Sequence, residues 1–108
     1  MERHAIIVVD IDGVIQHWSK GAARLIGYSP AEAIGQKVDL VVPLALRDQH
    51  WIGFHRAMKS GHAGNGEFFD IPVLCRTGEE KAMRGQLHIL ISESRHAIGA
   101  MAIFAEPA

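Results

Sequence analysis

The fold of this chain is decided by the stretch Leu25-Ile26-Gly27-Tyr28-Ser29-Pro30-Ala31-Glu32-Ala33-Ile34-Gly35. Gly27 is well placed to end a helix that Ser19 can cap, because glycine readily adopts the left-handed conformation that closes a helix. Ser29 and Glu32 form a capping box, with proline at the first helical position. The stretch therefore predicts two short helices that follow each other directly.

Strand-like segments lie on both sides of these helices. The β-branched run at residues 5–9 predicts a strand, and short acids with a glycine at residues 10–13 predict a hairpin turn. The longest helix is expected from about residue 44 to 60, with Gly61 as its stop signal and a glycine-rich loop at residues 62–66. Further strands are predicted at residues 14–18, 67–76, 81–92 and 97–105. The order β-β-α-α-α-β-β-β predicts an α+β fold with an antiparallel sheet.

Length and composition predict one globular domain covering residues 1–108. Hydrophobic residues make up 48% of the chain, charged residues 21%, and the net charge is -1, so no basic stripe indicates nucleic-acid binding. No apolar run is long enough to cross a membrane. The single cysteine, Cys75, excludes an internal disulfide. These features predict a cytoplasmic protein or domain.

His50 is the most informative single residue. It lies in the predicted helix at residues 44–60, and the positions three, four and eight residues on are Gly53, Phe54 and Met58. The imidazole therefore shares a helix face with an apolar stripe. A neutral, buried imidazole facing a pocket is what haem iron requires as an axial ligand, whereas a satisfied core histidine is the alternative.

The element order and several motifs resemble the PAS domain family. The resemblance rests on DIDGVI at 10–15, WSKGAA at 18–23, LIGYSPAEAIG at 25–35 and GAMAIF at 99–104. It implies a PAS fold, in which a five-stranded antiparallel sheet holds a ligand under its helices. It also implies a sensing function that is passed on through a dimer contact or an attached output domain.

Within that family, the long helix resembles that of the haem-binding members, the rhizobial oxygen-sensor kinases and the bacterial direct oxygen sensors. Their motif matches Pro43, Leu46, Arg47 and His50 of this chain. The resemblance implies haem b bound through His50, with Arg56 and His62 as candidate partners of the haem propionates. Pairing of propionates with cations is a physical need of any haem site.

The chain departs from the oxygen sensors at Asp70, where those proteins carry an arginine that stabilises bound dioxygen. We expect the distal wall to be apolar, since carbon monoxide, unlike dioxygen, needs little hydrogen bonding. Among the diatomic gases CO, NO and O2, the signal is therefore expected to be carbon monoxide or nitric oxide, or else redox state, more than high-affinity sensing of O2. Met83 or Met101 is a possible sixth iron ligand, although core filling is the simpler role. The residues expected to wall the cavity are Phe54, Phe68, Phe69, Leu87 and Ile89.

Other interpretations stay open at this stage. A haem-free PAS module for dimerisation or metabolite sensing explains the same motifs apart from His50, with Trp18, Trp51 and Ile103 on a contact surface. The strand followed by Asp10-Ile11-Asp12-Gly13 also resembles the nucleophile motif of haloacid-dehalogenase-type phosphatases, which need a parallel sheet. Histidine and cysteine spacing does not indicate a zinc site. We expect a homodimeric sensor without enzymatic turnover.

Overall fold

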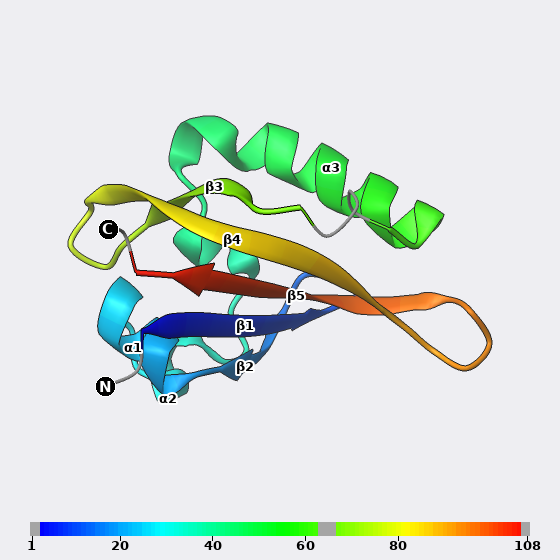
Figure 1. Ribbon diagram of the computed structural model, residues 1–108, viewed down its shortest axis with the longest axis horizontal. Coiled ribbons are helices and arrows are strands. Elements are labelled where there is room, and N and C mark those ends of the chain that lie inside the picture. Colours follow the sequence, from blue (N-terminus) through cyan, green and yellow to red (C-terminus); the bar gives the residue numbers. More distant parts are fainter. Residues whose placement is uncertain (1–2, 63–66, 107–108) are drawn as a thin grey trace.

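The computed structural model describes residues 3–62 and 67–106. Figure 1 shows strands running along the long axis of the molecule, with α1 and α2 next to β1 and β2. The long helix α3 packs against β5. Every helix in the described ranges is too short or too polar to cross a lipid bilayer. The elements, including two 3-10 turns, are β1 (His4–Asp10), β2 (Ile15–Trp18), α1 (Lys20–Ile26), α2 (Pro30–Ala33), η1 (Val38–Val41), η2 (Leu44–Leu46), α3 (Arg47–Ser60), β3 (Phe69–Leu74), β4 (Glu80–Ile91) and β5 (Ala97–Ala105). The predicted α+β order is confirmed.

The strands form one five-stranded antiparallel sheet in the order β2-β1-β5-β4-β3. Ala102 of β5 is paired with Ile7 of β1 on one side and with Leu87 of β4 on the other. Because side chains directly opposite each other share a face of the sheet, this row faces the helices together. A second row of side chains lies next to the first and consists of Val9, Ala100 and Ile89. Together, the two rows form the floor of the cavity described below.

The two short helices form as their capping residues predict. The Ser19 side chain accepts a hydrogen bond from the backbone N–H of Ala22 at 3.1 Å, and α1 ends at Gly27 with φ 106°. The Ser29 hydroxyl accepts from the backbone of Glu32 at 3.2 Å, while the Glu32 carboxylate accepts from the backbone of Ser29 at 2.9 Å. Reciprocal capping satisfies backbone donors that a four-residue helix otherwise leaves open.

The long helix begins later than predicted. Residues 44–46 form the 3-10 turn η2, closed by a hydrogen bond from the Leu46 N–H to the Pro43 carbonyl at 2.9 Å, and α3 starts only at Arg47. Such turns commonly precede an α-helix, so the apolar pattern alone does not separate the two. The helix ends at Gly61 as predicted, with φ 82°. Of the loop predicted at 62–66, residues 63–66 lie outside the described residues.

Trp18 does not belong to a contact surface, and that prediction was wrong. Its side chain is only 3% exposed, and the indole N–H donates to the carbonyl of Tyr28 at 2.8 Å. The pairing register puts Trp18 opposite Ile7, so both point to the helix-covered side of the sheet. A tryptophan read from sequence as an exposed anchor is therefore a core residue here.

The acidic turn after β1 has a structural role. One oxygen of the Asp10 carboxylate accepts hydrogen bonds from the backbone N–H groups of Asp12 and Val14, at 2.9 and 3.0 Å. Gly13 completes the turn with φ 80°, where a Cβ atom would lie 2.4 Å from the Trp51 ring. The sheet is antiparallel, whereas a dehalogenase-type phosphatase needs a parallel one, so the phosphatase interpretation was wrong.

Candidate functional site

A cavity of about 480 Å³ lies between the sheet and the helices η1, η2 and α3. It exists because small residues face each other across this space. The floor carries Ala100 and Ala102 of β5, and the roof carries Gly53 and Ala57 of α3. Protein interiors normally leave few voids larger than a water molecule, so a space of this size indicates a ligand.

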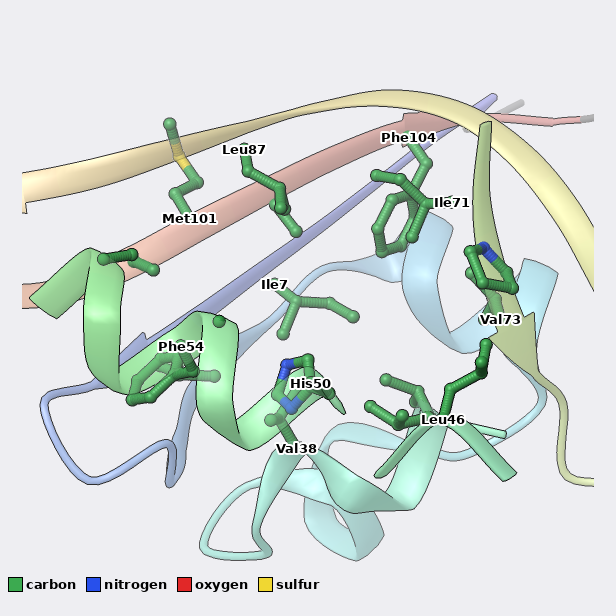
Figure 2. A pocket seen from close by; sticks show the side chains of 18 of the residues that line it. Ile7, Val38, Leu46, His50, Phe54, Ile71, Val73, Leu87, Met101 and Phe104 are labelled. Atoms are coloured by element: carbon green, nitrogen blue, oxygen red, sulfur yellow. The ribbon is translucent and has the colours of Figure 1, made fainter. Parts of the chain in front are cut away.

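The wall of the cavity is almost entirely apolar. Gln49 and His50, both on α3, are the polar residues in the lining formed by the described part of the chain. Figure 2 shows His50 and Phe54 on the helix side, with Leu87, Met101 and Phe104 on the sheet side. The full lining is Ile7, Val9, Val38, Val41, Val42, Pro43, Leu46, Gln49, His50, Gly53, Phe54, Ala57, Phe69, Ile71, Pro72, Val73, Leu87, Ile89, Ala100, Met101, Ala102 and Phe104.

His50 is held within an aromatic cluster on α3. Its ring stacks on Phe54 with the ring centroids 6.1 Å apart, and it meets the edge of Trp51 at 5.2 Å. The nitrogen Nδ1 is buried and has no hydrogen-bond partner among the described residues. The imidazole is therefore fixed by packing, while one of its polar atoms stays available to a further partner.

The surroundings of His50 favour the neutral imidazole. Burial lowers the pKa of His50 below its usual 6.5, because removing water disfavours the charged form. The carboxylate of Asp39 acts in the opposite direction and raises this pKa, and His55 lowers it further. A neutral imidazole has a lone pair on one nitrogen, which is the form that coordinates a metal or accepts a hydrogen bond.

The predicted wall residues are brought together only in part. Phe54, Phe69, Leu87 and Ile89 all line the same cavity as His50. Phe68 is not in the lining and is 60% exposed. Phe69 starts β3 and takes the inward position, and neighbouring residues of a strand point to opposite faces.

The two predicted cations, Arg56 and His62, are both exposed and do not line the cavity. Gln49 and Gly53 do line it and are nevertheless exposed, so they mark its mouth. Arg56 follows Gly53 by three helical positions, which puts it on the same face of α3, at the edge of that mouth. Arg56 is thus near the opening rather than inside, and His62 follows the end of the helix.

The structure also shows where the other residues considered in the sequence lie relative to the cavity. Asp70 is exposed and pairs with Arg84 across β3 and β4, with 3.7 Å between their charged atoms. His88 lies between Leu87 and Ile89 on β4, and these two neighbours, not His88, line the cavity. Met83 is completely buried in the core, whereas Met101 is part of the cavity lining.

Sequence reasoning missed two features of this region. Gln49 was not singled out, although its position directly before His50 on the helix was a usable signal. A second, polar hollow of about 330 Å³ is lined by Asp12, Lys37, Asp39, Trp51 and His55. Nothing in the spacing of these residues predicts it, because they come from a turn, η1 and α3.

Residues 3–105 match the family model described as the PAS fold.

This chain belongs to the PAS family.

It is therefore a PAS sensing and signalling domain, as its motifs predicted. The similarity to the sensor protein FixL of Bradyrhizobium diazoefficiens is 42% identity over 60 residues, which is 54% of this chain and 12% of that protein. The aligned part is thus a small fraction of the relative's full length. It supports the resemblance to the oxygen-sensor kinases that the long helix indicated.

Solved PAS domains share the architecture. The PAS domain of a protein from Colwellia psychrerythraea superposes with a TM-score of 0.80 at 26% identity, covering 96% of this chain and 86% of that one. The PAS domain of the quorum-sensing receptor RpfR from Cronobacter turicensis, solved in complex with C12:0, has a TM-score of 0.73 at 17% identity, covering 100% and 97%. The second similarity concerns the fold alone.

Proposed function

We propose that this PAS domain binds haem b through His50 and senses a diatomic gas or the redox state of the iron. The observation that carries the proposal is a neutral imidazole in the wall of an otherwise apolar cavity of about 480 Å³. The match to sensor protein FixL over 54% of the chain supports it. When bound, haem would supply an iron whose electronic state responds to small ligands.

The residues around His50 in the cavity wall fit an iron porphyrin. A porphyrin provides its own equatorial nitrogen ligands, so one protein imidazole is sufficient for an axial bond. His50 is held in place by Trp51 and Phe54, which limits rotation of the ring. Burial keeps the pKa of His50 low, so a proton does not compete with the metal near neutral pH. Apolar walls suit the faces of the macrocycle.

The mouth of the cavity fits the two carboxylates of haem. Gln49 offers an amide donor there, and Arg56 carries a cation at the edge of the same opening. Arg47 is less suitable, because its guanidinium already donates to the carbonyl of Val42 at 3.1 Å. We therefore assign Gln49 and Arg56 to the propionates, with His62 as a further candidate.

The sheet side of the cavity favours carbon monoxide over dioxygen as the sensed gas. Leu87, Ile89 and Met101 offer no strong hydrogen-bond donor, and Asp70 is engaged with Arg84 outside the cavity. Bound dioxygen is polar and gains from a donor, whereas carbon monoxide needs little help. We expect the reduced protein to oxidise quickly in air and to give a stable carbon monoxide spectrum. A long-lived oxygen complex would contradict this assignment.

Hemin titration of the purified protein tests the proposal. The parent should give a sharp Soret band that saturates at about one haem per chain. His50→Ala should lose stoichiometric binding while its circular dichroism spectrum stays unchanged. His55→Ala is the matched control, because His55 lies on the same helix but is exposed and outside the cavity lining. If His50→Ala binds hemin as tightly as His55→Ala, His50 is not the ligand.

A fatty acyl ligand is the second candidate. The cavity is lined by apolar side chains along its length and has Gln49 and Arg56 at its mouth, an arrangement that also suits a chain with a carboxylate head. A structurally similar PAS domain, that of RpfR, was solved in complex with C12:0. Dodecanoate that raises the melting temperature, in a protein that takes up no hemin, would favour this function.

We propose that the bound state is relayed without catalysis, through a homodimer contact or a linker to an output domain. The floor of the cavity is the sheet itself, so a ligand in contact with Leu87 and Ala102 acts directly on β4 and β5. A two-state change in sheet packing can then bias a contact elsewhere. Size-exclusion chromatography with and without ligand tests the dimer, and a cytoplasmic location stays a prediction.

A further inference from the structure

Two buried polar atoms near the cavity have no hydrogen-bond partner among the described residues: Nδ1 of His50 and Oδ1 of Asp39. A buried polar atom without a partner is costly, so native proteins rarely leave one open. Here the two atoms are complementary, since Nδ1 can carry a hydrogen and a carboxylate oxygen can only accept one. Their coincidence points to one shared interaction.

The position of Asp39 supports this pairing. Asp39 lies on η1 and lines the polar hollow together with Trp51, while its neighbour Val38 lines the main cavity. The ring of Trp51 also contacts the His50 ring, with 5.2 Å between the ring centroids, and the Asp39 carboxylate is close enough to act on the pKa of His50. Both atoms are closed off from water, so each can be satisfied only by a polar group that adjusts toward it.

We propose that Asp39 is the positioning residue of His50: after a small adjustment of its carboxylate, Oδ1 accepts the hydrogen on Nδ1 of His50 and so keeps Nε2 free for the ligand in the main cavity. The proposal rests on the proposed function only where it concerns haem, because the tautomer of His50 exists without it. The nitrogen that carries the hydrogen is set by the partner of that nitrogen. A carboxylate partner also makes the imidazole a stronger donor to a metal.

The first experiment concerns the haem-free protein. Nitrogen-15 NMR of the histidine rings should show His50 with its hydrogen on Nδ1 in the parent and in Asp39→Asn, since an asparagine oxygen still accepts. Asp39→Ala should lose that preference. Asp12→Ala is the control, because Asp12 lines the same hollow but does not act on the pKa of His50. If Asp39→Ala keeps the hydrogen on Nδ1, the proposal is overturned.

The second experiment uses the haem-loaded protein. Loss of such an outer partner typically lowers metal affinity about 10–100-fold, and Asp39→Ala should weaken hemin binding in that range. Asp39→Asn should keep most of the affinity but raise the reduction potential, because a negative charge near the iron is lost. An Asp39→Ala protein with parental affinity and potential contradicts the assignment. A parent that binds no hemin refutes the proposed function, while the NMR result still decides the role of Asp39.

Discussion

Substitution of Gly53 separates the stability of α3 from the accessibility of the cavity. Gly53 is the seventh residue of α3, lines the cavity and is exposed at its mouth. A Cβ atom built at this position meets nothing within 4 Å. A glycine inside a helix costs about 1 kcal/mol relative to alanine, because the unfolded chain loses more freedom on folding. This position is therefore suboptimal for the fold and open to larger side chains.

Gly53→Ala should stabilise the protein by about 0.5–1 kcal/mol, since no steric term opposes the gain in helix propensity. For a domain of this size that corresponds to a rise of about 2–8 °C in melting temperature. Urea denaturation and a thermal scan measure both quantities on the haem-free protein. A decrease in stability would show that the space around Gly53 is not open, and the reasoning about the cavity mouth would fail.

Gly53→Leu extends the same test to the ligand. Leucine has nearly the helix propensity of alanine, so the two variants should be similarly stable. The leucine side chain reaches over the mouth and should lower hemin affinity well below that of Gly53→Ala. Gly53→Ala is thus the matched control for occlusion. Equal hemin affinity in the two variants would show that haem does not enter between Gln49 and Gly53.

Further predictions concern the parts of the fold that support the site. Ser29→Ala should cost about 1 kcal/mol of unfolding free energy in urea denaturation, because it removes the cap of α2; an unchanged midpoint would argue against the capping box. The pKa of Glu32 lies below its usual 4.5, first because the Ser29 backbone donates to its carboxylate and also because Arg76 is close. The stability that this pKa shift contributes is complete above about pH 4.5 and is lost as the pH falls through the lowered pKa. Between about pH 5 and about pH 3, the melting temperature of Glu32→Gln should therefore decrease less than that of the parent. An equal decrease in both proteins would show that the Glu32 carboxylate does not contribute to this pH dependence. Trp18→Phe should cost about 1 kcal/mol, because the donor to the Tyr28 carbonyl is lost while the packing is largely kept; a thermal scan in which Trp18→Phe melts with the parent would contradict it.

Features that depend on residues close together in the chain could be predicted from the sequence, and features that depend on distant residues could not. The caps at Ser19 and Ser29, the left-handed glycines and the acidic hairpin turn all act within a few residues, and they occur where the sequence predicted them. The prediction for Trp18 was wrong because the burial of a side chain depends on what packs over it. Its partner across the sheet, Ile7, is 2% exposed, and the helices above both residues are not visible to a local pattern.

In the candidate site, too, local spacing predicted some features and could not predict others. A helix with His50 and Phe54 on one face followed from helical spacing, and both residues line the cavity. Helical spacing did not show that Arg56 stays outside the cavity lining, because it gives a direction around the helix axis but no depth. Whether Phe68 or Phe69 lines the cavity depends on where β3 starts, since a shift of one residue reverses the face of every side chain.

The sequence by itself determined the local elements, the PAS resemblance and the helix that presents His50. These depend on backbone preferences and on side chains close together in the chain, so a single sequence contains them. Only the tertiary structure decided that Ala100 and Ala102 face Gly53 across an open space, and that Asp39 comes to lie beside His50. A cavity is space left between elements that are distant in sequence. Its existence depends on strand register and helix placement, which the whole fold sets together.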